Sequence, residues 1–169
     1  LWPEFAALDT EFERREGWRK GDTPRLVRYS LATRDRTVWV VERSDVGQIP
    51  IASGSTIIMH NSPVDIPHFE EICPIPLGDL HIEDSMYASA VLWTGKVETD
   101  TQKGRVGGAT SHTLNYLGSI YARFNRWKHL DELAPRTYAG GDARGTMDVW
   151  ATGLHGGLSG QLDRDPASR

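Results

Sequence analysis

Three short apolar segments, separated by polar stretches, open the chain. Apolar residues dominate residues 5–12, alternate in part with polar ones over residues 25–31, and form a β-branched and aromatic run over residues 37–42. Segments of this length and composition are typical of β-strands. Because strands that follow each other along a chain usually pair as neighbours, we predict an antiparallel three-stranded meander.

After residue 50 the pattern changes to strands that alternate with helices. A buried strand is predicted over residues 56–60, followed by a short helix over residues 64–72 despite Pro67 in its middle. A second such unit follows, with a strand over residues 80–84 and a helix over residues 85–92. A strand that leads into a helix implies a crossover connection to a parallel strand, so we predict an α/β fold.

The last third of the chain combines a long polar connection with two helical patterns. Residues 94–111 are rich in Gly, Thr and charged residues, and a connection of this length is either mobile or functional. Helices are predicted over residues 112–121 and 135–154, whereas residues 156–169 have little to bury. We therefore assign residues 1–155 to one domain and residues 156–169 to a C-terminal tail or linker.

Size and composition limit the class of protein. A chain of 169 residues has the length of one domain, and its 38% hydrophobic content is sufficient for a core. No apolar run approaches the ~18 residues of a membrane-spanning helix. The single cysteine, Cys73, cannot form an internal disulfide, which favours a reducing compartment, most simply the cytoplasm. Because the chain begins at Leu1 without an initiator Met or a signal pattern, we expect a piece of a longer protein.

The net charge argues at first against a nucleic-acid partner. The chain has 19 Lys and Arg against 23 Asp and Glu, which gives a formal charge of −4 and a pI near 5.9. A plain nucleic-acid binder is expected to be basic. The exception is a protein whose acids gather in a site that bound cations neutralise, so the positions of the acids decide the question.

Two acidic arrangements occur near strand ends. Asp9 and Glu11 stand two residues apart at the end of the first predicted strand and therefore point to one face, as two ligands of one hard cation must. Asn61 ends a strand, and Asp65 stands four residues later at the start of a helix. Taken alone, each arrangement is common, because short acidic motifs often mark a polar strand end or a helix start.

A third arrangement lies in the last predicted helix. Tyr138 and Asp142 are four residues apart and would share one helix face. Gly140 and Gly141 lie between them, and each costs about 1 kcal/mol relative to Ala in a helix interior. Such a violation is expected where a metal, a strand or a ligand comes close to the backbone, and a loop is the alternative explanation.

The types, order and placement of these motifs agree with one family. Asp-x-Glu on the first strand, Asn-x-x-x-Asp at a strand-to-helix junction and Tyr-x-x-x-Asp on the last helix resemble the DEDDy 3′–5′ exonucleases of the ribonuclease-H-like fold. Residues 83–86 and 112–121 are similar to the proofreading domains of family A DNA polymerases, especially phage-type ones. The resemblance spans residues 5–154 and implies a mixed central sheet, with antiparallel strands 1–3 and then parallel strands, flanked by helices.

The resemblance also implies a site that binds two Mg²⁺ or Mn²⁺ ions. Asp9, Glu11 and Asp142 would hold the ion on the side of the nucleophile, and Asp9 would also bridge to the second ion. Asp65 would act in support through water. Tyr138 would orient the attacking water.

Other polar residues near these motifs have weaker claims to a role. His60 and Asn61 stand beside the second motif and are candidates for substrate contacts only. Asp84 follows a short strand, but a cap on the helix over residues 85–92 explains it more simply than metal binding. The six histidines show no zinc-binding spacing, and residues 104–108 lack the Lys-Ser/Thr ending of a phosphate-binding loop.

The substrate implied by the resemblance is a single-stranded DNA 3′ end. A DNA polymerase in the same or another chain would be the partner, in a bacterial or phage-infected host cell. The alternatives are a 3′–5′ exoribonuclease and a catalytically silent single-strand-binding domain.

Setting the four motif acids aside leaves 19 acids against 19 bases. Basic and aromatic side chains interleave near the last helix, which suits either contacts with a single strand or a solvated helix rim beside core aromatics. These residues are Tyr121, Arg123, Phe124, Arg126, Trp127, Lys128, Arg136 and Arg144.

Overall fold

The computed structural model describes residues 4–13, 24–48, 51–92, 112–122, 130 and 133–154. The predicted loop over residues 94–111, the tail over residues 156–169 and most of the predicted basic cluster lie outside this part of the chain. The described strands are β1 Phe5–Glu13, β2 Arg25–Ala32, β3 Val38–Glu42, β4 Thr56–Met59 and β5 His81–Asp84. The α-helices are α1 Ser62–Ile72, α2 Ser85–Leu92, α3 Leu114–Leu117 and α4 Pro135–Val149.

The five strands form one mixed sheet in the order β3-β2-β1-β4-β5. Strands β1, β2 and β3 pair antiparallel, and Asp9 lies opposite Ser30. Strands β4 and β5 are parallel to β1, with Ala7 beside Ile58. The predicted meander followed by parallel strands is therefore confirmed.

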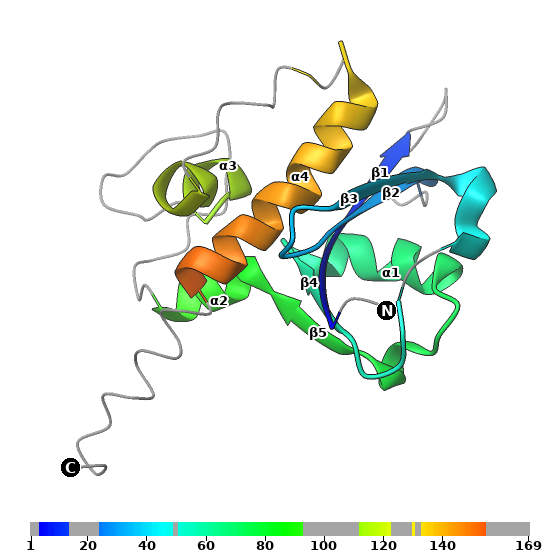
Figure 1. Ribbon diagram of the computed structural model, residues 1–169, viewed down its shortest axis with the longest axis horizontal. Coiled ribbons are helices and arrows are strands. Elements are labelled where there is room, and N and C mark those ends of the chain that lie inside the picture. Colours follow the sequence, from blue (N-terminus) through cyan, green and yellow to red (C-terminus); the bar gives the residue numbers. More distant parts are fainter. Residues whose placement is uncertain are drawn as a thin grey trace.

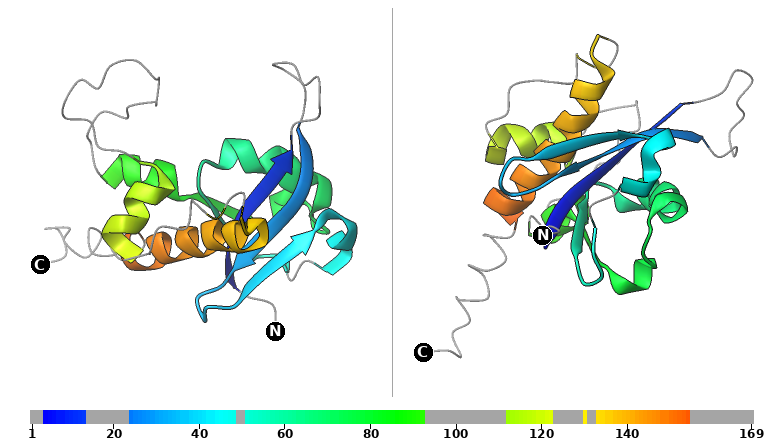
Figure 2. Two further views of the ribbon diagram at one scale, coloured as in Figure 1. Left: turned by 90° about the horizontal axis from the view of Figure 1, so that it is seen from above. Right: turned by 45° about the vertical axis from the view of Figure 1, so that its right-hand side comes forward.

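Helices cover both faces of the sheet, as Figures 1 and 2 show. Since successive side chains of a strand point to opposite faces, neighbouring residues of β1 enter different cores. Leu8 belongs to the core that contains Phe69 of α1. Ala7 belongs to the core that contains Met147 of α4. Strand β1 thus lies between the two helices that carry the second and third motifs.

Helix α4 packs against β2 and β3, and Gly140 permits its close approach to β3. A Cβ atom on Gly140 would stand 3.3 Å from methyl carbons of both Val38 and Val40. The hydroxyl of Ser30 on β2 donates a hydrogen bond of 2.7 Å to the Ala139 carbonyl. At Gly140 the structure shows the close approach of a strand, and the segment is helical rather than a loop.

The helix boundaries differ little from the predicted ones. Helix α1 begins at Ser62, two residues earlier than predicted, because Pro63 fits the first turn, where its missing N–H has no partner to lose. The last helical segment continues beyond α4 as a π-helical turn, Trp150–Leu154. A π-helical turn, Gly118–Ala122, likewise extends α3. No helix in the described part of the chain is both long and apolar enough to cross a membrane.

Candidate active site

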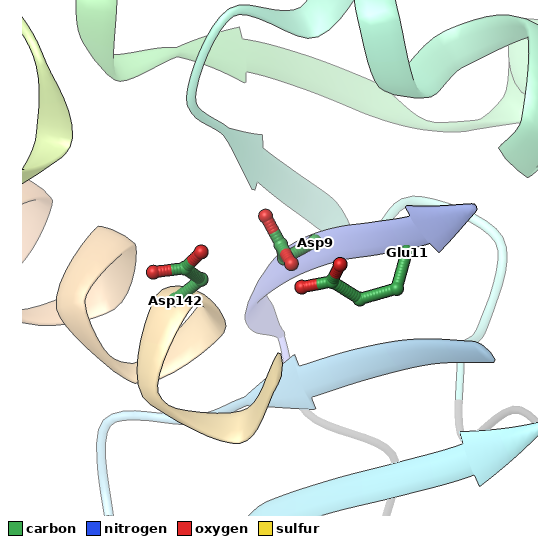
Figure 3. A group of neighbouring side chains, drawn as sticks. All are labelled: Asp9, Glu11 and Asp142. Atoms are coloured by element: carbon green, nitrogen blue, oxygen red, sulfur yellow. The ribbon is translucent and has the colours of Figure 1, made fainter. Parts of the chain in front are cut away.

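Three carboxylates meet at the end of β1 beside α4. One oxygen from each of Asp9, Glu11 and Asp142 lies within 4.8 Å of the other two, and Figure 3 shows the side chains converging from the strand and the helix. Asp142 is buried, whereas the two residues on the strand are partly exposed. The first and third predicted motifs are therefore brought together, although Glu11 and Asp142 are 131 positions apart along the chain.

The local structure of β1 explains why both of its acids face α4. Residues two apart share one face of a strand, so Asp9 and Glu11 lie on the same face as Ala7, which packs in the core against α4. The pairing with β2 then shifts, because Glu11 lies opposite Arg28 and Phe12 lies opposite Leu26. A bulge of this kind bends the strands and increases their twist, so the ladder changes direction directly after Glu11.

Asp65, from the second motif, reaches β1 from the opposite face of the sheet. Its Oδ1 accepts hydrogen bonds from the Thr10 amide at 3.1 Å and from the Thr10 hydroxyl at 2.5 Å. Thr10 is the residue between Asp9 and Glu11, and its side chain points away from theirs. Asp65 is thus attached to the strand of the first motif, but it is not a member of the group of three.

The environment of Asp65 favours its protonated form when no cation is present. Burial of this carboxyl, which is 5% exposed, raises its pKa from 3.8 to about 6, against the effect of the two hydrogen bonds from Thr10. The negative charges of Asp84 and Asp142 make smaller contributions to this rise in pKa.

Tyr138 lies one helical turn before Asp142 on α4. Its side chain is partly buried and packs against a small core formed by Leu114, Leu117 and Val149. The predicted i, i+4 relationship between Tyr138 and Asp142 is therefore present in an unbroken helix. Contact of the Tyr138 hydroxyl with the acidic group stays a prediction.

His60 follows β4 and is held by Ser85 at the start of α2. The Ser85 hydroxyl donates to the Met59 carbonyl at 3.1 Å and lies 2.9 Å from the Nδ1 atom of His60. A hydroxyl has one hydrogen, so when Ser85 donates it to the Met59 carbonyl, it can only accept from a protonated Nδ1 of His60. His60 is the first residue after β4, the strand that pairs parallel with β1.

Asn61 adopts a left-handed conformation, with φ 71° and ψ 53°, immediately before α1. Its side chain does not cap the helix. Instead, its backbone amide donates to the Asp84 carboxylate at 3.2 Å. The suggested roles of His60 and Asn61 in substrate contact stay predictions.

The sequence gives little indication that two residues of this region, Thr10 and Asp84, belong with the site. Thr10 has a signal only in its position, since a residue between two acids on a strand must face the opposite side. Asp84 does cap α2 as expected, because it accepts from the Met86 and Tyr87 amides. Its additional hydrogen bonds to the start of α1 form because β5 pairs with β4. They therefore leave no signal in the sequence.

The group of three carboxylates fits a hard divalent cation. Carboxylate oxygens are the preferred ligands of Mg²⁺, and oxygens on opposite sides of this ion are ~4.2 Å apart. The observed separations, up to 4.8 Å, would close to this value by small side-chain rotations. The Oδ2 atom of Asp9 is shielded from solvent. Away from water, a cation and a carboxylate attract each other more strongly.

The sequence matches no protein-family model, and no curated protein is detectably similar to it. Solved structures are similar in fold. The Nibbler EXO domain of Aedes aegypti matches with a TM-score of 0.58 and 12% identity, over 98% of this chain and 84% of that one. Brucella melitensis NrnC with bound Mg²⁺ matches with a TM-score of 0.61 and 18% identity, over 98% of this chain and 78% of that one. Escherichia coli RNase D, an exoribonuclease, matches with a TM-score of 0.53 and 17% identity, over 98% of this chain and 42% of that one. The predicted ribonuclease-H-like fold is therefore confirmed.

Proposed function

We propose that this chain is a metal-dependent 3′–5′ exonuclease that removes nucleotides from single-stranded ends. The observation that carries the proposal is the convergence of Asp9, Glu11 and Asp142 at the end of β1. The presence of Asp65 behind β1 and of Tyr138 one turn before Asp142 supports it. The fold adds support, because the structures that share it include exonucleases.

Each residue then has a distinct task. Asp9, Glu11 and Asp142 would hold one Mg²⁺ or Mn²⁺ ion, and Asp9 would bridge to a second. When bound, such ions lower the pKa of an attacking water and neutralise charge on the phosphoryl group. Tyr138 would orient the attacking water through its hydroxyl. Asp65 would support the ion through water while it remains bonded to Thr10.

The nucleic acid is the finer part of the proposal. We propose a DNA 3′ end, with a DNA polymerase as partner, because of the similarity of residues 83–86 and 112–121 to polymerase proofreading domains. An RNA 3′ end is the second candidate. It is favoured by the structural neighbours, which include Escherichia coli RNase D and the RNase D of Trypanosoma brucei in complex with RNA U12.

The test is digestion of 5′-labelled DNA and RNA oligonucleotides of the same sequence, with Mg²⁺ or Mn²⁺. We expect a ladder that shortens from the 3′ end and disappears with EDTA or with Asp142→Asn. Asp79→Asn is the matched control, because Asp79 is exposed and precedes β5, at the end of that strand away from Asp84. Uncut oligonucleotides of both kinds would contradict the proposal, and binding without cleavage would indicate a silent domain.

A further inference from the structure

Asp84, the last residue of β5, joins the starts of two helices. Its Oδ2 accepts from the Ser62 amide at 2.6 Å, and its Oδ1 accepts from the Asn61 amide at 3.2 Å. The same Oδ1 accepts from the amides of Met86 at 2.8 Å and Tyr87 at 3.2 Å. A carboxylate has about four lone-pair sites. Three of these amides share Oδ1 and one bonds to Oδ2, so they use most of the acceptor capacity of Asp84 and make it a structural acceptor.

The start of α1 depends on this carboxylate. The side chain of a helix's own N-cap residue normally accepts a hydrogen bond from an amide of the first turn. The N-cap residue then has an extended backbone. Asn61 is left-handed and supplies no such bond. Asp84 supplies it from the neighbouring strand, where its negative charge also suits the positive end of the helix. The sparsely populated conformation of Asn61 is therefore held from outside its own segment.

We infer that Asp84 is a positioning residue of the candidate active site. It fixes the first turn of α1 through Ser62, and Asp65 stands three residues later in that turn. Asp65 in turn bonds to Thr10, between the two acids of β1. A continuous series of hydrogen bonds and one helical turn thus connects Asp84 to the acidic group. The catalytic part of this inference rests on the proposed exonuclease function, whereas the metal-binding part is tested by itself.

The alternative is that Asp84 only stabilises the fold. Replacement would then lower the melting temperature but leave the cation affinity of the folded protein unchanged. Asp84→Asn separates the two readings, because an amide keeps one acceptor oxygen and places a donor where the other oxygen was. At least one helix start then loses its partner, with little change in side-chain size.

The matched control is Asp35→Asn. Asp35 also accepts from a backbone amide, that of Thr37 at 3.1 Å, and from the Thr33 hydroxyl, but it lies in the turn between β2 and β3. Both variants and the unsubstituted chain are titrated with Mn²⁺ by calorimetry at a temperature where circular dichroism shows all three folded. Then kcat and KM are measured on a single-stranded oligonucleotide.

For Asp84→Asn we expect Mn²⁺ affinity and kcat to fall by about 10- to 100-fold, as for other residues that orient metal ligands, with KM changed less than about threefold. The control should match the unsubstituted chain. A folded Asp84→Asn variant with unchanged affinity and kcat would overturn the inference.

Two further outcomes are decisive. If Asp84→Asn does not fold, Asp84→Glu takes its place, because it keeps the charge and moves the oxygens by one methylene group. Unchanged Mn²⁺ affinity in folded Asp84→Glu would overturn the inference, and weaker affinity would support it. A chain that binds Mn²⁺ in an Asp84-dependent way but cleaves no oligonucleotide would contradict the exonuclease proposal alone.

Discussion

Thr10 donates two hydrogen bonds to the same carboxylate oxygen of Asp65, one from its backbone amide and one from its hydroxyl. The two residues are 55 positions apart and lie on β1 and α1. Asp9 and Glu11 face α4, while Thr10 between them faces α1. The Thr10–Asp65 pair therefore connects the helix on one face of the sheet with the acids on the other.

Thr10→Val should weaken this connection while keeping a β-branched side chain on β1. The amide bond to Asp65 remains, but the hydroxyl bond, which lowers the Asp65 pKa, is lost. We expect the pKa of Asp65 to rise, the free energy of unfolding to fall by about 2 kcal/mol, and activity at pH 7 to fall ~10-fold. The loss should shrink as pH rises, because Asp65 ionises again. Thr10→Ser keeps the hydroxyl and is the control, and a valine variant with an unshifted pH–rate profile would refute the prediction.

Asp65→Asn should stabilise the metal-free protein above pH 6. The Asp65 pKa is raised to about 6 by burial, from 3.8. Between pH 3.8 and pH 6 the folded state binds more protons than the unfolded state. The contribution of the Asp65 carboxyl to the free energy of unfolding is therefore present below pH 4 and is lost as pH rises through 6. The full shift corresponds to ~3 kcal/mol at most. Asn cannot ionise, and its carbonyl oxygen can still accept both bonds from Thr10.

Urea unfolding in EDTA at pH 4 and pH 8 measures this difference. From pH 4 to pH 8, we expect the free energy of unfolding of Asp65→Asn to rise relative to that of the unsubstituted chain. Thr10→Ser, which leaves the Asp65 carboxyl in place, should keep the pH dependence of the unsubstituted chain. If the stability difference between Asp65→Asn and the unsubstituted chain is the same at both pH values, the carboxyl does not titrate in this range and the prediction fails.

The sequence predicted those features that depend on local periodicity. Two-residue spacing placed Asp9 and Glu11 on one face, and apolar patterns located every described strand. The mixed sheet followed from short connections in the first part of the chain and crossover helices in the second. These relationships need only the geometry of a strand or a helix, so they are readable from neighbouring residues.

Features that depend on contacts between distant segments could not be read in this way. Asp84 was expected to cap α2, but its bonds to Asn61 and Ser62 exist only because β5 pairs with β4. The pair Gly140-Gly141 signalled a close approach without showing which group approached. In the structure, side chains of β3 lie against Gly140. The partner in each case is set by the tertiary fold, which no local pattern encodes.

Gly140→Ala should misplace α4 while leaving stability almost unchanged. The new Cβ would stand 3.3 Å from methyl carbons of Val38 and Val40, so the helix or the strand must move by a few tenths of an ångström. Better helix propensity, about 1 kcal/mol, offsets the crowding. Because a 1 Å error costs ~100-fold in rate, we expect a loss of about three- to fivefold in kcat. Adding Val38→Ala and Val40→Ala should restore kcat. A triple variant no better than Gly140→Ala would show that crowding against β3 is not the cause.

Asp142→Asn should change thermal stability in opposite directions with and without cation. Without cation, three carboxylates within 4.8 Å repel one another, so removing one charge should raise the melting temperature. With Mn²⁺ at 100 times its dissociation constant, the unsubstituted chain gains about 2.7 kcal/mol, or ~5–10 °C for a chain of this size. The variant should gain far less, whereas Asp79→Asn should respond as the unsubstituted chain does. Differential scanning fluorimetry with Mn²⁺ or EDTA measures all three. An equal Mn²⁺ response in Asp142→Asn would place the cation elsewhere, since the buried carboxylate that α4 contributes to this group would then make no contribution to binding.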